Sequence, residues 1–221
     1  MSIQSTPHKS KPLRFNFRSL RIYFCLVAIF ISLQNITFAQ SIDSFLEDFT
    51  PFSPSLTVSA SYSPISFEAW GTIQNAQMLF LSSNFHHHQI RNGSFNVDIS
   101  SGIIFAGWLR YPFDGIDGPR ENRYGLGFVP LDLSIPILSG DSYPFFTTSF
   151  GFMVMNRSFP NELGATLNYL LDAGLGYRYR LNENNSIEFG YKLHHLSNGN
   201  TSIENPGIDS HMIFFNFFFH L

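Results

Sequence analysis

Hydrophobic and polar residues alternate along much of the chain, most clearly near the C-terminus. There, one face of an extended segment is formed by Ile213, Phe215, Phe217, Phe219 and Leu221. A period of two with one uniformly apolar side is typical of a β-strand with one buried or lipid-facing surface. No long stretch carries a helical period. The pattern therefore predicts an all-β protein.

Eight extended segments follow one another after residue 54. They span roughly 55–71, 75–90, 94–109, 124–138, 143–156, 166–181, 184–198 and 208–221. Short connections rich in turn residues alternate with longer ones, except that the first connection, 72–75, is also short. Outer-membrane barrels have short turns on the periplasmic side and longer loops outside. We therefore predict an eight-stranded antiparallel up-and-down transmembrane β-barrel, whose interior is filled by side chains and forms no porin channel.

The N-terminal region has the pattern of a secretory signal peptide. Five basic residues precede an apolar run at 22–33, and the small-residue sequence Thr37-Phe38-Ala39 follows it. The run is shorter than the roughly 20 residues that a membrane-spanning helix needs. We expect a cleaved signal peptide at 1–39, an irregular segment at 40–54 and the barrel at 55–221. An uncleaved anchor is the alternative.

Composition favours a membrane barrel over a soluble protein. Aromatic residues make up 17% of the chain and charged residues only 13%, whereas soluble domains carry about a quarter charged residues. Removal of the leader, with its five basic residues, would leave 8 basic residues against 16 acidic ones, a formal net charge of −8. No basic patch for nucleic acid survives. A soluble, exported β-sandwich remains an alternative that explains the aromatic content less well.

Candidate chemistry lies near the outer end of the seventh segment. His195 and Ser197 share the apolar face of that segment, and Asp209 and His211 share the apolar face of the next one. All four are therefore predicted to point outward, and simple antiparallel register would place Asp209 opposite Ser197 and His211 opposite His195. A serine, a histidine and a carboxylate within reach of one another support nucleophilic acyl transfer. The alternative is a group of solvated polar residues at a strand end.

These residues resemble a known family. The run His195-Leu196-Ser197-Asn198, followed by Asn205-Pro206-Gly207-Ile208-Asp209-Ser210 and an apolar terminal strand, is similar to the lipid A 3-O-deacylase family of PagL type. The similarity extends from Gly190 to the end of the chain. It implies an eight-stranded outer-membrane barrel that removes an ester-linked acyl chain from lipid A.

The resemblance also implies roles for individual residues. Ser197 would be the nucleophile, His195 the general base and Asp209 the acid, although the best-known members have glutamate there. Oxyanion stabilisation, which is needed because charge develops on the carbonyl oxygen, would come from Asn205 and a backbone N–H near Gly199 or Asn200. The residues implied to stabilise the oxyanion or position the substrate are Asn198, Gly199, Asn200 and Asn205.

The sequence thus predicts an outer-membrane esterase that acts on lipid A in the outer leaflet and needs no cofactor. Its partners would be lipopolysaccharide and outer-membrane lipids, and a homodimer is left open. The alternatives are an esterase that acts on phospholipid and a small non-enzymatic barrel with a structural or surface-binding role.

Other polar and aromatic residues receive simpler interpretations. The run His86-His87-His88 suggests a metal site, but only alternate residues of a strand share a face. We therefore interpret the run as a polar strand end. Aromatic girdles at the membrane interfaces are predicted to include Trp70, Trp108, Tyr111, Tyr124 and Tyr143.

Overall fold

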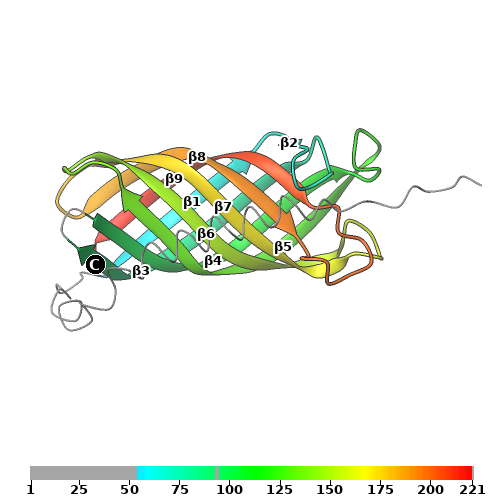
Figure 1. Cartoon of the computed structure of the whole chain (residues 1–221), viewed down its shortest axis with the longest axis horizontal. Helices are drawn as coiled ribbons and strands as arrows, with labels where there is room; N and C mark the ends of the chain where they lie inside the picture. Colours follow the sequence, from blue (N-terminus) through cyan, green and yellow to red (C-terminus); the bar gives the residue numbers. More distant parts are fainter. Residues whose placement is uncertain (1–53, 93–94, 221) are drawn as a thin grey trace, which may run out of the picture. The chain divides into compact units, whose positions relative to one another are not determined.

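The computed structural model describes residues 54–92 and 95–220, which form a closed antiparallel β-barrel (Figure 1). The strands are β1 (Ser55–Ser63), β2 (Ser66–Phe67), β3 (Gln77–Asn92), β4 (Phe95–Pro112), β5 (Arg120–Pro136), β6 (Tyr143–Phe159), β7 (Ala165–Arg180), β8 (Asn185–Ser197) and β9 (Ile208–His220). Each long strand pairs with the next, and β1 pairs with β9 to close the barrel. The prediction of eight long strands is confirmed, and β2 is a short addition beside β9.

The predicted signal peptide (1–39) and nearly all of the segment at 40–54 lie outside the described residues. Within the part of the chain that is described, no helix is long and apolar enough to cross a membrane.

The two ends of the barrel differ in their connections. One end, at the right in Figure 1, carries β2 and the connections at 113–119, 160–164 and 198–207. We call it the loop end. The opposite end carries the connections between β5 and β6 and between β7 and β8, together with the end of β9. This asymmetry is typical of outer-membrane barrels, whose longer loops face outside.

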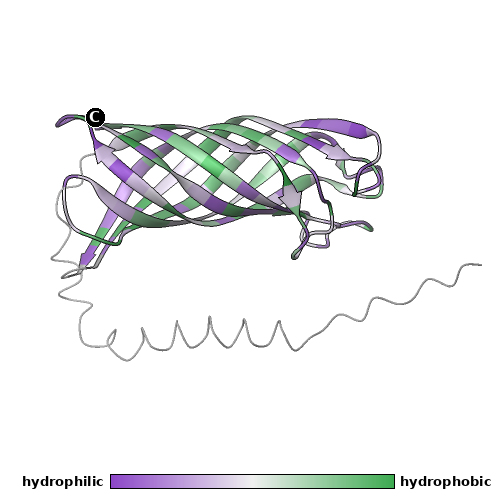
Figure 2. Cartoon of the chain, turned by 90° about the horizontal axis from the view of Figure 1, so that it is seen from above, coloured by the Kyte–Doolittle hydropathy of each residue, from purple (hydrophilic) through white to green (hydrophobic). Residues whose placement is uncertain are grey.

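The outer surface of the barrel is apolar along its strands. Figure 2 shows hydrophobic and hydrophilic positions alternating along the ribbons. Phe189 is 52% exposed and Ile213 is 58% exposed, whereas their neighbours Glu188 and Met212 are buried. Large apolar side chains that cover a surface in this way fit a lipid environment. The faces predicted from the alternation in β8 and β9 are therefore confirmed.

The interior near the loop end is filled by apolar side chains. A continuous buried cluster there includes Leu109, Tyr111, Phe159, Leu196 and Ile208. Buried apolar side chains packed at this density exclude water and hold the strands in fixed positions. The loop end of β8 and β9 thus has a rigid support beneath it.

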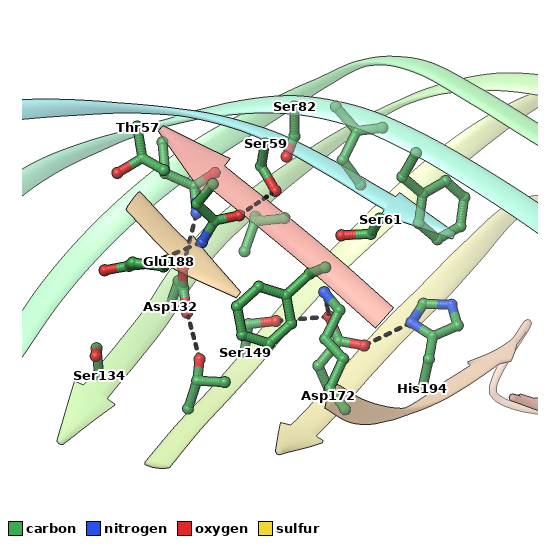
Figure 3. A pocket seen from close by; sticks show the side chains of 18 of the residues that line it. Thr57, Ser59, Ser61, Ser82, Asp132, Ser134, Ser149, Asp172, Glu188 and His194 are labelled. Atoms are coloured by element: carbon green, nitrogen blue, oxygen red, sulfur yellow. Dashed lines mark hydrogen bonds and ion pairs between the residues drawn. The ribbon is translucent and has the colours of Figure 1, made fainter. Parts of the chain in front are cut away.

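The rest of the interior is lined by polar and charged side chains (Figure 3). Asp172 binds the His194 ring at 2.6 Å and Lys192 Nζ at 2.9 Å. Arg178 forms an ion pair with Glu188 at 2.5 Å and also donates to the Tyr143 hydroxyl at 2.7 Å. The groups surround a cavity of about 80 Å³. Because the charges are buried, each depends on its partner for compensation.

Replacement of Arg178 by methionine should therefore destabilise the barrel. The change leaves the buried Glu188 carboxylate without its cation, and we expect the free energy of unfolding to fall by about 3–5 kcal/mol. Arg180→Met is the matched control, because Arg180 and Asp141 form an ion pair whose side chains are 41% and 80% exposed. That pair should contribute less than about 1 kcal/mol. Urea titration of both variants in lipid vesicles measures the difference, and equal losses would contradict this role of Arg178.

The first predicted segment, 55–71, is wrong in its second half. The chain turns after Ser63, because Pro64 has no N–H for a sheet ladder and the Ser63 hydroxyl donates to the Ile65 carbonyl at 3.0 Å. The chain then forms β2 and an irregular stretch at 68–76 before β3 begins. The first connection at the loop end, 64–76, is consequently the longest of the four at that end.

The assignment of Tyr111 and Tyr143 to membrane-interface girdles is also wrong. The ladder between β4 and β5 continues to the pair Pro112–Arg120, which is farther than the sequence predicted. Tyr111 is buried inside the barrel, where its hydroxyl donates to the Pro160 carbonyl. Tyr143 is bound to Arg178 in the polar interior. Both residues therefore stabilise the inside of the barrel.

Candidate active site

The hairpin of β8 and β9 brings the candidate residues together in a register that differs from the prediction. Asp209 pairs with His195, not with Ser197, and His211 pairs with Leu193, not with His195. The predicted register is therefore wrong by two residues. Because a shift of two residues keeps each side chain on its face of the sheet, the four residues still share the outer surface.

Hydrogen bonds within the connection between β8 and β9 explain this register. The Asn198 carbonyl accepts from the N–H and the hydroxyl of Thr201, and the Asn198 N–H donates to Asn205 Oδ1 at 2.9 Å. Gly199 and Asn200 both have left-handed backbones, with φ of 63° and 62°. These bonds form a compact turn, so the ladder ends at the pair Leu196–Ile208 and Asp209 lies opposite His195.

Ser197, His195 and Asp209 form a continuous chain of hydrogen bonds. The Ser197 hydroxyl lies 3.0 Å from His195 Nε2, and His195 Nδ1 lies 2.7 Å from Asp209 Oδ1. With the carboxylate accepting from Nδ1–H, Nε2 is free to accept the serine proton. The other carboxylate oxygen, Oδ2, accepts from the backbone N–H groups of Trp70 at 2.6 Å and Gly71 at 2.5 Å. The arrangement can activate a serine for attack on a carbonyl carbon.

The strands hold these three side chains firmly in place. Leu196, between His195 and Ser197, is fully buried in the apolar interior, and so is Ile208, which precedes Asp209. The shorter side chain of aspartate reaches the histidine because the two residues are directly opposite in the ladder, where Cβ atoms lie about 5 Å apart. A site built on packed strands in this way is better ordered than one built on loops.

Comparison with known proteins identifies the family. The sequence profile described as "Lipid A 3-O-deacylase (PagL)" matches residues 77–218, which include the three hydrogen-bonded residues. The chain belongs to the PagL family. A search of curated proteins found no match.

A solved structure has the same fold. The crystal structure of the outer membrane enzyme PagL is 16% identical, covers 72% of this chain and 97% of its own, and superimposes with a TM-score of 0.55. Neisserial surface protein A is 9% identical, covers 77% of this chain and 98% of its own, and has a TM-score of 0.47. Membership of the PagL family and the barrel fold place the chain in the bacterial outer membrane and support a lipid A deacylase.

The stretch between β2 and β3 contributes to the site of this PagL-family barrel and was not predicted to do so. Its backbone runs beside the start of β9, with Thr72 N donating to the Pro206 carbonyl at 2.7 Å. A Cβ atom on Gly71 would lie only 2.5 Å from the carbonyl carbon of Gly207. The Trp70 ring meets the His195 ring edge-on, with centroids 5.7 Å apart. Glycine at 71 was the only sequence signal of this close approach.

Gly71→Ala should reduce activity without unfolding the barrel. The added methyl group pushes the stretch away from Gly207 and breaks the N–H bonds to Asp209, so we expect kcat to fall about 100-fold, as small displacements of catalytic groups do. Thr72→Ala is the control, because it removes only an exposed side-chain bond to the Pro206 carbonyl. Steady-state kinetics of both variants provide the test, and a kcat of Gly71→Ala equal to that of Thr72→Ala would contradict it.

The three consecutive histidines do not share one face of β3. His86 faces the interior and lies 2.7 Å from the Thr57 hydroxyl, while His87 is exposed and lies 3.0 Å from the Ser101 hydroxyl. A register shift between His86 and His88 breaks the simple alternation of faces at this point. Among the described residues, no three His, Cys, Asp or Glu side chains are placed to hold a metal ion.

Proposed function

We propose that this protein hydrolyses the ester-linked acyl chain at the 3-O position of lipid A, with Ser197 as nucleophile, His195 as general base and Asp209 as the orienting acid. The observation that carries the proposal is the chain of hydrogen bonds from the Ser197 hydroxyl through the imidazole to the Asp209 carboxylate. It lies on the lipid-facing side of the barrel near the loop end, where lipid in the outer leaflet reaches it sideways.

In the acylation step, His195 Nε2 takes the proton of the Ser197 hydroxyl while Oγ forms a bond to the ester carbonyl carbon. The tetrahedral intermediate then collapses, and the bond between that carbon and the sugar oxygen breaks. The sugar oxygen receives the proton from His195 and leaves as an alcohol. In the second step, His195 removes a proton from water, which attacks the carbonyl carbon of the acyl-serine. The bond from that carbon to Ser197 Oγ then breaks, Oγ receives the proton from His195, and the fatty acid leaves. The residues supply all proton transfers without a cofactor.

The turn after β8 would stabilise the oxyanion. Within the described residues, no hydrogen bond uses the N–H group of Gly199 or Asn200 as a donor, and successive N–H groups in left-handed turns can bind anions. Asn205 supports them, because its side chain binds the Asn198 N–H and donates to Asn200 Oδ1 at 3.0 Å. Asn198 fixes the same turn through its bond to the Glu204 carbonyl at 2.7 Å. Donors held in this way stabilise the developing charge without reorganisation.

Purified protein in detergent micelles tests the substrate class. Lipid A and phosphatidylethanolamine are supplied in parallel, and the products are analysed by mass spectrometry. We expect loss of one 3-O-linked acyl chain from lipid A and no lysophospholipid. Conversion of phosphatidylethanolamine alone would favour a phospholipid esterase, and no product from a correctly folded barrel would favour a non-enzymatic role. Loss of an acyl chain from another position of lipid A would refute the 3-O assignment.

A further inference from the structure

An exposed histidine lies on the lipid-facing surface next to the candidate active site. His211 follows Asp209 by two residues on the same face of β9 and pairs with Leu193 across the hairpin. Two exposed apolar side chains lie beside it: Leu193 on β8 and Ile213 on β9. Polar side chains that face lipid are unfavourable, so they generally bind one another or serve a function. The proposed catalytic mechanism does not use His211.

Two aromatic side chains fix the orientation of this ring. Phe67 of β2 stacks on His211 with centroids 4.3 Å apart and an interplanar angle of 26°. The Tyr191 ring of β8 has its centroid 5.8 Å from that of His211, and its hydroxyl forms a hydrogen bond with His211 Nδ1 at the edge of the imidazole. The imidazole is therefore held by stacking on Phe67 and by a hydrogen bond at its edge from Tyr191. Such an arrangement leaves its orientation little freedom.

The bond to Tyr191 also determines what the rest of the imidazole can do. A phenol O–H is a stronger donor than a neutral imidazole N–H, so the hydroxyl donates to Nδ1, and the ring then carries its own proton on Nε2. Within the described residues, no hydrogen bond engages Nε2 of His211. His211 thus presents a fixed N–H donor on the lipid-facing surface. In these apolar surroundings, an unpaired N–H group is unfavourable, and an acceptor oxygen of a lipid would stabilise it.

We propose that Nε2–H of His211 binds a carbonyl oxygen of a second acyl chain of the bound lipid and thereby selects which ester reaches Ser197. This inference rests on the proposed function. The register of the hairpin places His211 four residues farther from the loop end than the position opposite Ser197, which is about 13 Å along the strand. Because barrel strands are tilted by about 35–45°, this separation has a component of about 8–10 Å in the membrane plane and a similar one in depth, and a lipid with several acyl chains spreads its carbonyl groups over such distances. When one ester carbonyl is at Ser197, another is within range of His211.

Selection by a hydrogen bond gives a clear kinetic signature. A donor that contacts a second acyl chain improves kcat/KM for a lipid with several chains and does nothing for an ester with only one. Hydrogen bonds of this kind change specificity by about 10- to 100-fold. If the ring were only part of an interfacial aromatic belt, its replacement would change kcat/KM for neither substrate.

His211→Phe tests the inference, because phenylalanine keeps a ring stacked on Phe67 but removes the donor. The probes are lipid A and p-nitrophenyl laurate, which has a single acyl chain, in the same micelles. We expect kcat/KM for lipid A to fall at least tenfold and kcat/KM for p-nitrophenyl laurate to stay within twofold. Mass spectrometry of the lipid A products should also show cleavage at more than one acyl position. Tyr177→Phe, which removes an exposed hydroxyl from the outer surface of β7, is the matched control and should change neither rate.

Three outcomes would overturn the inference. Unchanged kcat/KM for lipid A would show that His211 is only an interfacial ring. Equal losses on both substrates would show that it acts on the catalytic residues and not on the second chain. A wild-type protein that hydrolyses p-nitrophenyl laurate but leaves lipid A intact would refute the proposed function itself, and the inference with it. The wild-type control therefore separates the two failures.

Discussion

Replacement of Ser197 by alanine should lower the rate of fatty acid release from lipid A by about 10⁴-fold or more. The change removes the atom that would form the acyl-enzyme, and what remains is the rate supported by oxyanion donors and substrate binding alone. The fold should be unaffected, because the Ser197 side chain makes a single hydrogen bond within the described residues, to His195. The measurement is the initial rate with purified protein in micelles.

Ser202→Ala is the matched control for this prediction. Ser202 lies in the connection between β8 and β9, and its replacement should leave the rate within twofold. Urea titration of both variants should give the same midpoint as the wild type. If Ser197→Ala kept a tenth or more of the wild-type rate, another group would have to be the nucleophile.

Asp209→Asn should lower kcat about 1000-fold with little change in KM. Asparagine has nearly the same shape as aspartate but no charge, so it cannot stabilise the protonated imidazole, and its amide favours the wrong tautomer of His195. KM changes little because Asp209 binds His195 and the backbone at Trp70 and Gly71, and not the substrate. Steady-state kinetics on lipid A measure both constants.

Asp209→Glu separates the charge from the geometry. Glutamate keeps the carboxylate, so kcat of Asp209→Glu should be at least tenfold higher than kcat of Asp209→Asn. If the two variants were equally slow, the loss would come from broken bonds to the Trp70 and Gly71 backbone. If Asp209→Asn were as fast as the wild type, His195 would not need the acid.

The alternation of residues was sufficient to predict which side chains face lipid. Phe189, His195 and Ile213 share the outward face and Glu188 and Met212 the inward face, as a period of two requires. The prediction is dependable because the side-chain direction in a strand depends only on the position along it. The same reasoning places the serine, the histidine and the aspartate on one surface from the sequence alone.

Register and long-range contacts could not be predicted in this way. The pairing of Asp209 with His195 depends on hydrogen bonds inside the connection after β8, and alternation carries no information about them. The N–H group of Trp70 reaches Asp209 from 139 residues away in sequence. Tyr111 was assigned to an interfacial girdle, whereas the ladder with β5 continues past residue 109 and Tyr111 is buried inside the barrel.

The most direct test of the central claim uses a bacterial host that produces lipopolysaccharide. Wild-type protein and Ser197→Ala are expressed to equal levels in its outer membrane, and lipid A is isolated and analysed by mass spectrometry. We expect the wild type to remove one ester-linked acyl chain from lipid A and the variant to leave lipid A intact. Identical lipid A from both strains, whether intact or shortened, would contradict the account.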